Sequence, residues 1–282
     1  MLQVAALVWF GFMLCSPAFS QEPNQIDQAF SRLYNFDFPG AHAALNERIS
    51  SNPEDPLSYA VRASADLFYE LDRLSILEGE FFSDDKRIAD KKNVKPDPAN
   101  RALLFKALDD AQSHAQAHLA VNPNDQNALF ASCIATGVLG DYTALVEKKQ
   151  ISSLSLVKRS TAFAQRLLKL NPHFYDAYLT TGTTEYLIGS LPFFVRWFVK
   201  VDNINGNKNQ GMQTVQLVAD KGRYLKPFAK ILLAIANLRE KRPHESEKLL
   251  IELSHEFPEN PLFKKELAQL SAKIRSGELR AQ

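Results

Sequence analysis

The stretch NPHFYDAYLTTGTTEYLIG, residues 171–189, indicates how this chain folds. Its Asn-Pro pair is typical of the end of a helix, and a new helical pattern starts within a few residues. In that pattern Tyr178, Gly182, Tyr186 and Gly189 follow one another at spacings of four, four and three, so they share one face of a helix. A small residue on this face lets a paired helix pack close to it. The stretch therefore predicts a pair of closely packed helices.

The same closing proline occurs at Asn52-Pro53, Asn122-Pro123 and Phe257-Pro258. Together with Pro172, these prolines stand 70, 49 and 86 residues apart (123−53, 172−123 and 258−172). With its small-residue face, the pattern resembles the tetratricopeptide repeat, whose period is about 34 residues. Seventy residues is close to two periods, whereas 49 and 86 require insertions. The resemblance implies an irregular right-handed superhelix of helix-turn-helix repeats, an architecture that usually binds other proteins.

The composition favours one helical domain with no strong charge. The 282 residues include 45% hydrophobic side chains, and 33 basic residues stand against 32 acidic ones. This balance does not favour nucleic-acid binding, which depends on a positive surface. Glycine is scarce and apolar residues recur mostly every three or four positions, so we expect an all-α fold of about eleven helices. Residues 21–282 are predicted to form one repeat domain, with an insertion around residues 190–211.

Residues 1–20, MLQVAALVWFGFMLCSPAFS, have the pattern of a secretory signal peptide. An apolar run from Val4 to Leu14 precedes Ala18-Phe19-Ser20, which fits a small-x-small cleavage site. The run has about 11 residues, whereas a helix that spans a membrane needs about 20. Cleavage after Ser20 would export the protein to the periplasm or the secreted space. Because no Lys or Arg precedes the apolar run, an uncleaved N-terminal anchor is the alternative.

Periodicity also predicts the positions of individual helices. Helices are expected near residues 25–36, 41–51, 99–121, 153–170 and 262–274, and another is expected to start at about residue 57. Phe38-Pro39-Gly40 and Gly140-Asp141-Tyr142 are expected to form turns between paired helices. The charged residues 83–98, which end in two prolines, are expected to form an exposed connection.

No sequence motif for catalysis occurs. The chain contains no phosphate-binding loop, GxSxG or GxGxxG sequence. His114 and His118 have the i,i+4 spacing of a zinc pair, but no third ligand follows at motif spacing, so we interpret them as polar residues on an exposed helical face. Cys133 lies in an apolar helical pattern and is expected to be buried. We therefore predict a protein that is not an enzyme and holds no metal or cofactor.

Residues 190–211, SLPFFVRWFVKVDNINGNKNQG, depart from the repeat pattern, and two interpretations of them are open. Residues 191–201 could form an aromatic wedge that contacts a membrane surface, a lipid or a partner. The same segment could instead fill the inside of the superhelix, because soluble proteins seldom expose large apolar patches. The wedge residues are Phe193, Phe194, Arg196, Trp197, Phe198 and Lys200.

Leu187–Leu217 is similar to the central stretch of eukaryotic outer-mitochondrial-membrane and lipid-droplet tetratricopeptide proteins. In those proteins a Leu-Pro helix is followed by Gly-acidic-basic-x-x-Gly-Leu. Here Asn207 replaces the acidic residue and Met212 replaces the leucine. The similarity implies a related helical-repeat architecture. It does not carry over a mitochondrial role, because the chain begins with a predicted secretory signal.

The leading functional interpretation is a non-enzymatic scaffold of the cell envelope or secreted space, which binds a protein or peptide on the concave face of the superhelix. The family pattern places on that face Asn127, Phe130, Ile134, Asp176, Thr183, Tyr186, Phe228, Ile235 and Arg239. The competing interpretation is that many of these residues only pack against adjacent helices. The alternative function is a lipid- or membrane-associated envelope protein that uses residues 191–201. A subunit for assembling a larger secretion or cell-wall complex is a third possibility.

Overall fold

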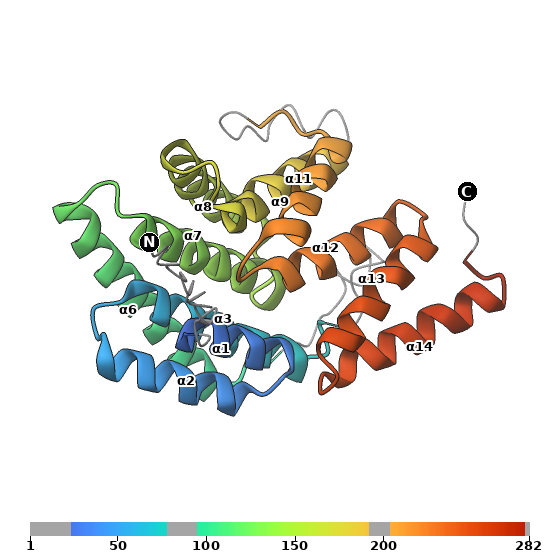
Figure 1. Ribbon diagram of the computed structural model, residues 1–282, viewed down its shortest axis with the longest axis horizontal. Helices are drawn as coiled ribbons and strands as arrows, with labels where there is room; N and C mark the ends of the chain where they lie inside the picture. The colour runs from blue at the N-terminus through green and yellow to red at the C-terminus, as the bar shows by residue number, and fades with distance from the viewer. Residues whose placement is uncertain (1–23, 78–94, 192–203, 280–282) are drawn as a thin grey trace, which may run out of the picture.

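The computed structural model describes residues 24–77, 95–191 and 204–279. In this part of the chain there is no β-strand, and eleven α-helices follow one another (Figure 1). They are α1 (Gln25–Tyr34), α2 (Phe38–Ser51), α3 (Pro56–Arg73), α6 (Pro98–Val121), α7 (Gln126–Asp141), α8 (Gln150–Leu170), α9 (Tyr178–Ser190), α11 (Lys208–Lys221), α12 (Lys226–Arg239), α13 (Pro243–Glu256) and α14 (Pro261–Arg275). The all-α class and the expected number of helices are thus confirmed for the described residues. The predicted signal peptide lies outside them, and so do wedge residues 193–200.

The helices pack in consecutive pairs: α1 with α2, α3 with α6, α7 with α8, α9 with α11, and α12 with α13. The predicted closing prolines mark the junctions between these pairs. Asn52, Asn122, Asn171 and Phe257 are the C-cap residues of α2, α6, α8 and α13, and each is followed directly by its proline. A proline at this position cannot continue the helix, so the chain must turn into the next pair.

The next pair usually begins with an acidic or amide N-cap. Asp55 accepts a hydrogen bond from the Leu57 N–H, Asp125 from the Ala128 N–H, and Asn260 from the Leu262 N–H. These side chains satisfy backbone donors that the first turn of a helix leaves without a partner. Helix end, proline and cap therefore form one short unit that repeats along the chain.

The predicted turn at Phe38-Pro39-Gly40 is wrong, because these residues form the first turn of α2. The chain reverses at Asn35–Asp37, where Phe36 has a φ of 62°. Asp37 then caps α2 by accepting a hydrogen bond from the Gly40 N–H at 2.9 Å. Proline is tolerated in a first turn, where its missing N–H would have had no helical partner.

The predicted turn at Gly140-Asp141-Tyr142 is also wrong. Helix α7 continues through Asp141, and Tyr142–Val146 extends it as a π-helix. The reversal comes at Glu147–Lys149, where Lys148 has a φ of 60°. Tyr142 is fully buried and packs edge-on against Phe105, with ring centroids 5.3 Å apart. Burial of this large side chain keeps the segment helical past the glycine that suggested a turn.

Helices α9 and α11 cross at a contact between glycines. A Cβ atom added at Gly182 would lie 2.9 Å from Thr214 Cβ, and one added at Gly211 would lie 2.5 Å from the backbone N of Tyr186. Both distances are shorter than van der Waals contact allows. Gly182 therefore lies where two helices approach closely, as its place in residues 171–189 predicted.

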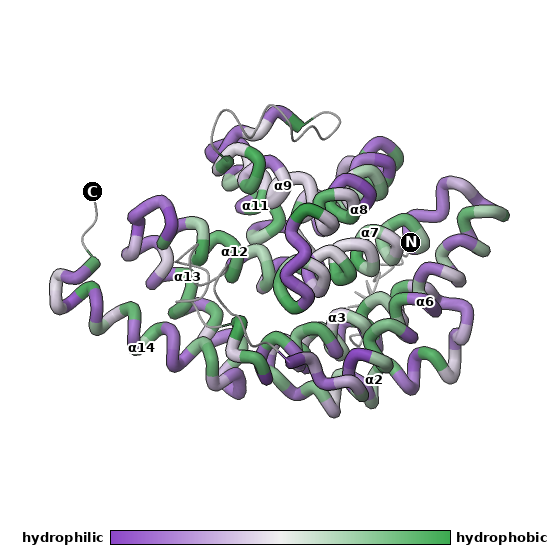
Figure 2. The backbone as a smooth tube through the Cα atoms, turned by 180° about the vertical axis from the view of Figure 1, so that it is seen from behind, coloured by the Kyte–Doolittle hydropathy of each residue, from purple (hydrophilic) through white to green (hydrophobic). Residues whose placement is uncertain are grey.

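The helical array closes on itself, because α1 contacts turns that come late in the chain. The Tyr34 hydroxyl donates to the Tyr224 carbonyl at 3.0 Å, and the Asn260 amide donates to the Tyr34 carbonyl at 2.8 Å. Arg223 forms an ion pair with Asp27 at 2.8 Å. The buried core accordingly extends from α1 to α14. In Figure 2 the backbone of α7 is white or green along most of its length, whereas α14 alternates between green and purple.

One helical stretch of the described residues, Gln126–Val146, is long and apolar enough to cross a membrane. Its most apolar window is 67% buried inside the protein. A helix in the core of a protein can be as long and as apolar as a membrane helix, because both are surrounded by apolar groups on all sides.

Candidate binding surface

The nine residues predicted to face a partner come from the first helices of three pairs, α7, α9 and α12, and from the 3-10 turn Tyr175–Ala177 before α9. Asn127 and Arg239 are exposed. Ile134, Thr183, Phe228 and Ile235 are half-buried. Phe130, Asp176 and Tyr186 are buried, with 1%, 5% and 8% of their surface exposed. The three buried residues contact other parts of the chain, and each has a recognisable structural role.

Phe130 belongs to an aromatic stack that fills the centre of the array. Its ring centroid is 4.8 Å from that of Phe174 and 6.2 Å from that of Tyr224. Tyr224 in turn stacks on Phe30 of α1 at 5.3 Å. Such contacts contribute packing energy beyond the burial of their area. A partner could reach Phe130 only by displacing these rings.

Asp176 holds the turn between α11 and α12. Its carboxylate accepts hydrogen bonds from the backbone N–H groups of Arg223 at 3.1 Å, Tyr224 at 3.0 Å and Leu225 at 2.7 Å. Burial raises the pKa of Asp176, although the three N–H groups favour the carboxylate and lower it. Because this turn carries both Tyr224 and Arg223, Asp176 positions the residues that close the array onto α1.

Tyr186 links α9 to the end of α12. Its hydroxyl donates to Glu240 at 3.3 Å, and the same carboxylate oxygen accepts from Lys208 Nζ at 2.8 Å. Burial and the nearby Glu240 charge raise the pKa of Tyr186. Burial alone would raise the pKa of Glu240, but the Lys208 ammonium outweighs it and holds that pKa below its usual value. The link thus joins Tyr186, which was predicted to face a partner, to two residues that were not predicted.

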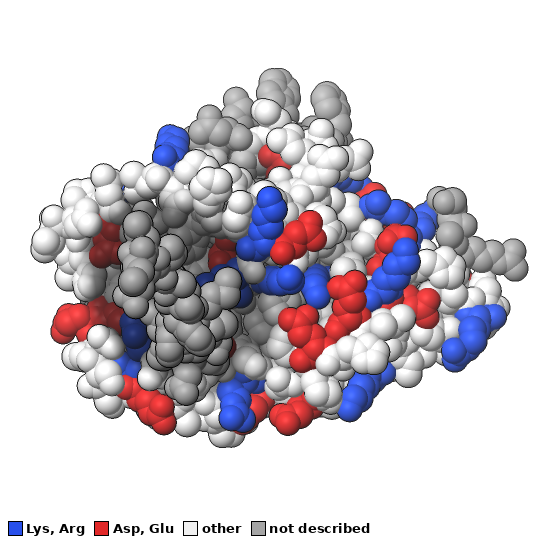
Figure 3. Space-filling model, viewed as in Figure 1, with Lys and Arg blue, Asp and Glu red and all other residues white. Residues whose placement is uncertain are grey.

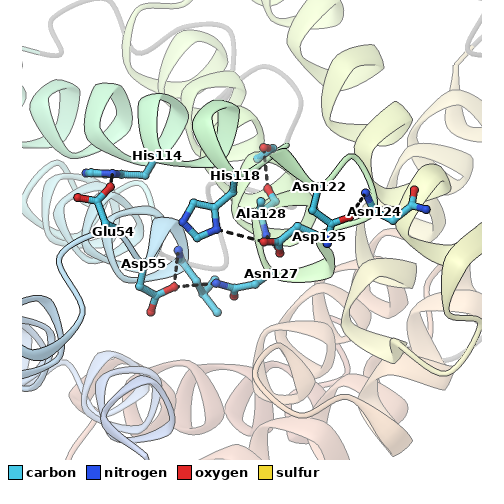
Figure 4. Close-up of polar contacts among 11 residues, drawn as sticks. Glu54, Asp55, His114, His118, Asn122, Asn124, Asp125, Asn127 and Ala128 are labelled. Atoms are coloured by element: carbon cyan, nitrogen blue, oxygen red, sulfur yellow. Dashed lines mark hydrogen bonds and ion pairs between the residues drawn. The ribbon is translucent and has the colours of Figure 1, made fainter. Parts of the chain in front are cut away.

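Asn127 takes part in a polar network at the junction of the first three pairs (Figure 4). Its amide donates to Asp55 Oδ1 at 2.7 Å. The other oxygen of Asp55 accepts from Arg48 at 3.0 Å and from the Ser58 hydroxyl at 2.8 Å. A buried carboxylate with this many donors is fully satisfied. Asn127 therefore fastens α7 to the cap of α3 while its outer side is exposed.

His114 and His118 are more constrained than the predicted exposed face would make them. His114 Nδ1 lies 3.0 Å from Glu54 and the ring stacks on Tyr59 at 4.9 Å, while His118 Nδ1 lies 3.1 Å from Asp125. Figure 4 shows the two rings pointing to different carboxylates. In the part of the chain that the structure describes, no three His, Cys, Asp or Glu side chains are grouped so that they could hold a metal ion. The pair therefore fastens α6 to the adjacent turns.

The prediction that Cys133 is buried is confirmed. Its sulfur lies 3.2 Å from the Thr180 hydroxyl and 3.5 Å from the Ser160 hydroxyl, between α7, α8 and α9. Burial raises the pKa of this thiol. The thiolate is the reactive form of cysteine, so this environment disfavours reactivity.

What remains accessible is a narrower surface than the one predicted. Ile134, Thr183 and Ile235 are half-buried, and Leu187 on α9 is an apolar side chain with 52% of its surface exposed. Arg239 is exposed at the end of α12. We call Thr183, Leu187, Ile235 and Arg239 the α9–α12 face. On the side of the molecule seen in Figure 3, positive and negative side chains are intermixed.

Sequence reasoning missed the residues that hold this surface together. Glu240, Lys208, Arg223 and Tyr224 belong to no motif and come from turns or helix ends. Their roles depend on partners that are 32 to 196 residues away in sequence. The one local signal available was Gly222, which ends α11 and marks the turn.

No protein-family model matches the chain, and neither a curated protein nor a solved structure shows significant similarity to it.

Proposed function

We propose that this protein is a non-enzymatic scaffold built from tetratricopeptide-like helical hairpins, which binds a protein or peptide on its α9–α12 face. The packing order supports the proposal. The second helix of each pair contacts the first helix of the next, and α3 contacts both α1 and α7. This is the pattern of a stacked repeat, in which successive first helices share one side. The contacts between α1 and the turns before α12 and α14 would make such a superhelix short and tightly wound.

The observation that carries the proposal is the exposed apolar character of the α9–α12 face. Leu187 and Ile235 leave apolar surface accessible on two neighbouring first helices, and Arg239 adds a positive charge beside them. The Tyr186–Glu240–Lys208 link fixes the two helices relative to each other. A rigid surface of this kind binds a ligand with little loss of conformational entropy. The ligand it fits is a peptide segment with apolar side chains.

Site-specific photo-crosslinking in the native host tests this function. A photoreactive residue at Ile235 should give a discrete adduct of higher mass. The matched control is a photoreactive residue at Lys169, which is exposed on α8. Adducts of equal yield from both positions, or none from Ile235, would contradict binding on this face. Loss of the Ile235 adduct in a Leu187→Asp background would show that one surface is responsible.

The second candidate function, contact with a lipid or membrane surface, rests on the aromatic sequence of residues 191–201. Wedge residues 193–200 lie outside the described residues, so both sequence-based interpretations of them stay predictions. Export through cleavage after Ser20 also stays a prediction, and it sets the compartment for either function. N-terminal sequencing of protein from its native host should begin at Gln21 if export is right.

A further inference from the structure

The last two helices form a groove on the outside of the array. It measures about 560 Å³ and is lined by Ser254, His255, Lys264, Leu267, Ala268, Ser271 and Arg275. The α14 residues among them have the spacing i, i+3, i+4, i+7 and i+11, so they occupy one face of that helix. Its floor is apolar or small, and one turn before His255 the side chain of Ile251 on α13 is 42% exposed. The groove is therefore lined by apolar or small side chains together with the basic residues Lys264 and Arg275.

Helix α14 occupies the place of a first helix, and no second helix among the described residues covers it. It follows the Phe257–Asn260 junction just as α3 and α7 follow theirs, and it packs mainly on α13. In every earlier pair the first helix is covered by a second helix. Only Phe263 and Leu270 of α14 are buried. The groove thus lies where another helix would continue the stacking.

The charged residues that line the groove, Lys264 and Arg275, are both basic, and the carboxylate of Glu247 accepts a hydrogen bond from the lining residue Ser271. Lys264, Arg275 and His255 form no hydrogen bond or ion pair with any residue that the structure describes. Lys264 and Arg275 are 11 residues apart on one helix, which separates them by about 16 Å along its axis. In Figure 3 blue side chains lie along the lower right edge, where Figure 1 places α14, and red side chains lie on the surface next to them. Two cations at this distance suit carboxylates spread along an extended ligand better than a single small anion.

We propose that the α13–α14 groove binds an acidic amphipathic helix of a partner protein. The apolar face of that helix would cover Leu267, Ala268 and Ile251, and its carboxylates would pair with Lys264 and Arg275. Apolar contact supplies most of the binding free energy in such a complex, while the charges select the partner and its orientation. This surface is separate from the α9–α12 face, so an experiment that refutes binding at one surface leaves the proposal for the other unaffected.

A fluorescent synthetic peptide tests the proposal. The probe is an amphipathic helix of about 15 residues with Leu on one face and Glu on the other, and its binding to the full chain is followed by fluorescence anisotropy. We expect saturable binding that weakens as salt is added, because salt screens exposed charges. A peptide with Lys in place of every Glu should bind about ten-fold more weakly or worse.

Charge-reversed variants locate the site. The double change Lys264→Glu/Arg275→Glu should weaken binding of the acidic peptide by about ten-fold and improve binding of the basic one. The matched control is Lys158→Glu/Lys169→Glu on α8, which changes the net charge equally at two exposed lysines. Circular dichroism checks that all variants remain folded. The proposal is overturned if both peptides bind equally, if neither binds, or if the control weakens binding as much as the groove variant does. A dimer in sedimentation that the groove variant dissociates would also overturn it, in favour of a second copy of this chain.

Discussion

At the scale of single residues, Gly182 of α9 and Gly211 of α11 are positions where the chain tolerates little change. A side chain at Gly182 would meet Thr214 and Val215, and a Cβ at Gly211 would meet backbone atoms of α9. Side chains can move to a limited extent, whereas a packed helix backbone cannot. The contact between the two helices therefore depends on the absence of a side chain at these two positions.

We predict that Gly182→Leu destabilises the protein by about 1–3 kcal/mol, because it overpacks this contact. Gly211→Ala should cost at least as much, although it adds only one carbon. The matched control is Gly137→Ala in α7, where an added Cβ meets only the Ser160 hydroxyl at 3.6 Å. Thermal melts should drop by several degrees for the first two variants. An unchanged melt for Gly182→Leu would mean that α9 and α11 do not cross at these glycines.

Asp176 is the second sensitive residue, because its carboxylate satisfies three part-buried backbone donors. Asp176→Ala should destabilise the protein by about 3 kcal/mol, since the donors of the α11–α12 turn lose their acceptor. The control is Asp27→Asn, which removes the carboxylate that pairs with the Arg223 side chain and leaves the backbone bonds of the turn in place. That exposed pair should contribute about 1 kcal/mol or less. If urea denaturation gave the two variants the same loss of unfolding free energy, the stabilisation would come from the Arg223–Asp27 ion pair and not from the turn.

The Glu240–Lys208 pair predicts a small dependence of stability on pH. Lys208 lowers the pKa of Glu240 in the folded state. The stabilisation from the Glu240–Lys208 pair is therefore fully present above the pKa of Glu240 in the unfolded chain, about 4.3. It is lost as the pH falls through the lower pKa that Glu240 has in the folded protein. We expect Glu240→Gln to be less stable than the parent at pH 6, with the difference shrinking towards pH 3. A difference that stays constant with pH would show that the charge is not involved.

At the scale of elements, the sequence predicted helices well and turns poorly. Closing prolines and caps are local, so the junctions at Asn52, Asn122, Asn171 and Phe257 could be identified directly. The turns within pairs depend on packing instead. Gly140 suggested a turn, but burial of Tyr142 against Phe105 keeps that segment helical. In α2, Pro39 and Gly40 suggested a turn because a first helical turn tolerates the same residues.

The fluorescence of Trp197 can test whether the aromatic segment, residues 191–201, is buried in the array or contacts lipid. After cleavage of residues 1–20 it would be the only tryptophan in the chain. If the segment fills the inside of the array, we expect blue-shifted emission that lipid vesicles and an aqueous quencher leave unchanged. A shift to shorter wavelength with vesicles, abolished by Phe194→Asp in a folded variant, would favour the membrane interpretation. Because large exposed apolar patches promote association, the first outcome is the one we expect.

At the scale of the whole molecule, closure of the array was beyond sequence reasoning. The contacts that join α1 to the late turns link residues 190, 196 and 226 positions apart. No periodic pattern reports on such pairs, and the resemblance to an open repeat suggested a free concave face. The predicted binding residue Phe130 shows the consequence, because Tyr224 and Phe174 cover it. Local patterns determine the hairpins, but only packing in three dimensions determines how far the array curls.

Closure should also change how the protein unfolds. In an open repeat array each unit contacts only its neighbours, so the two ends loosen independently. Here the Asn260 amide donates to the Tyr34 carbonyl, while its side-chain oxygen caps α14 through the Leu262 N–H. Asn260→Asp keeps the cap and replaces the donor with a carboxylate that faces a carbonyl oxygen. This single change therefore disrupts closure without removing the helix cap.

We predict that Asn260→Asp increases hydrogen exchange in α1 and α14 together, although these helices are at opposite ends of the described chain. Protection in α8 should change little, because α8 packs mainly against α7 and α9. Asn124→Asp is the control, since Asn124 is exposed in the corresponding junction between α6 and α7. A loss of protection confined to α14 would mean that the two ends are not coupled. Loss of protection in both α1 and α14 would show that contacts across about 200 residues make the array one cooperative unit. Such contacts are costly in loop-closure entropy, so they form only when the whole array is in place.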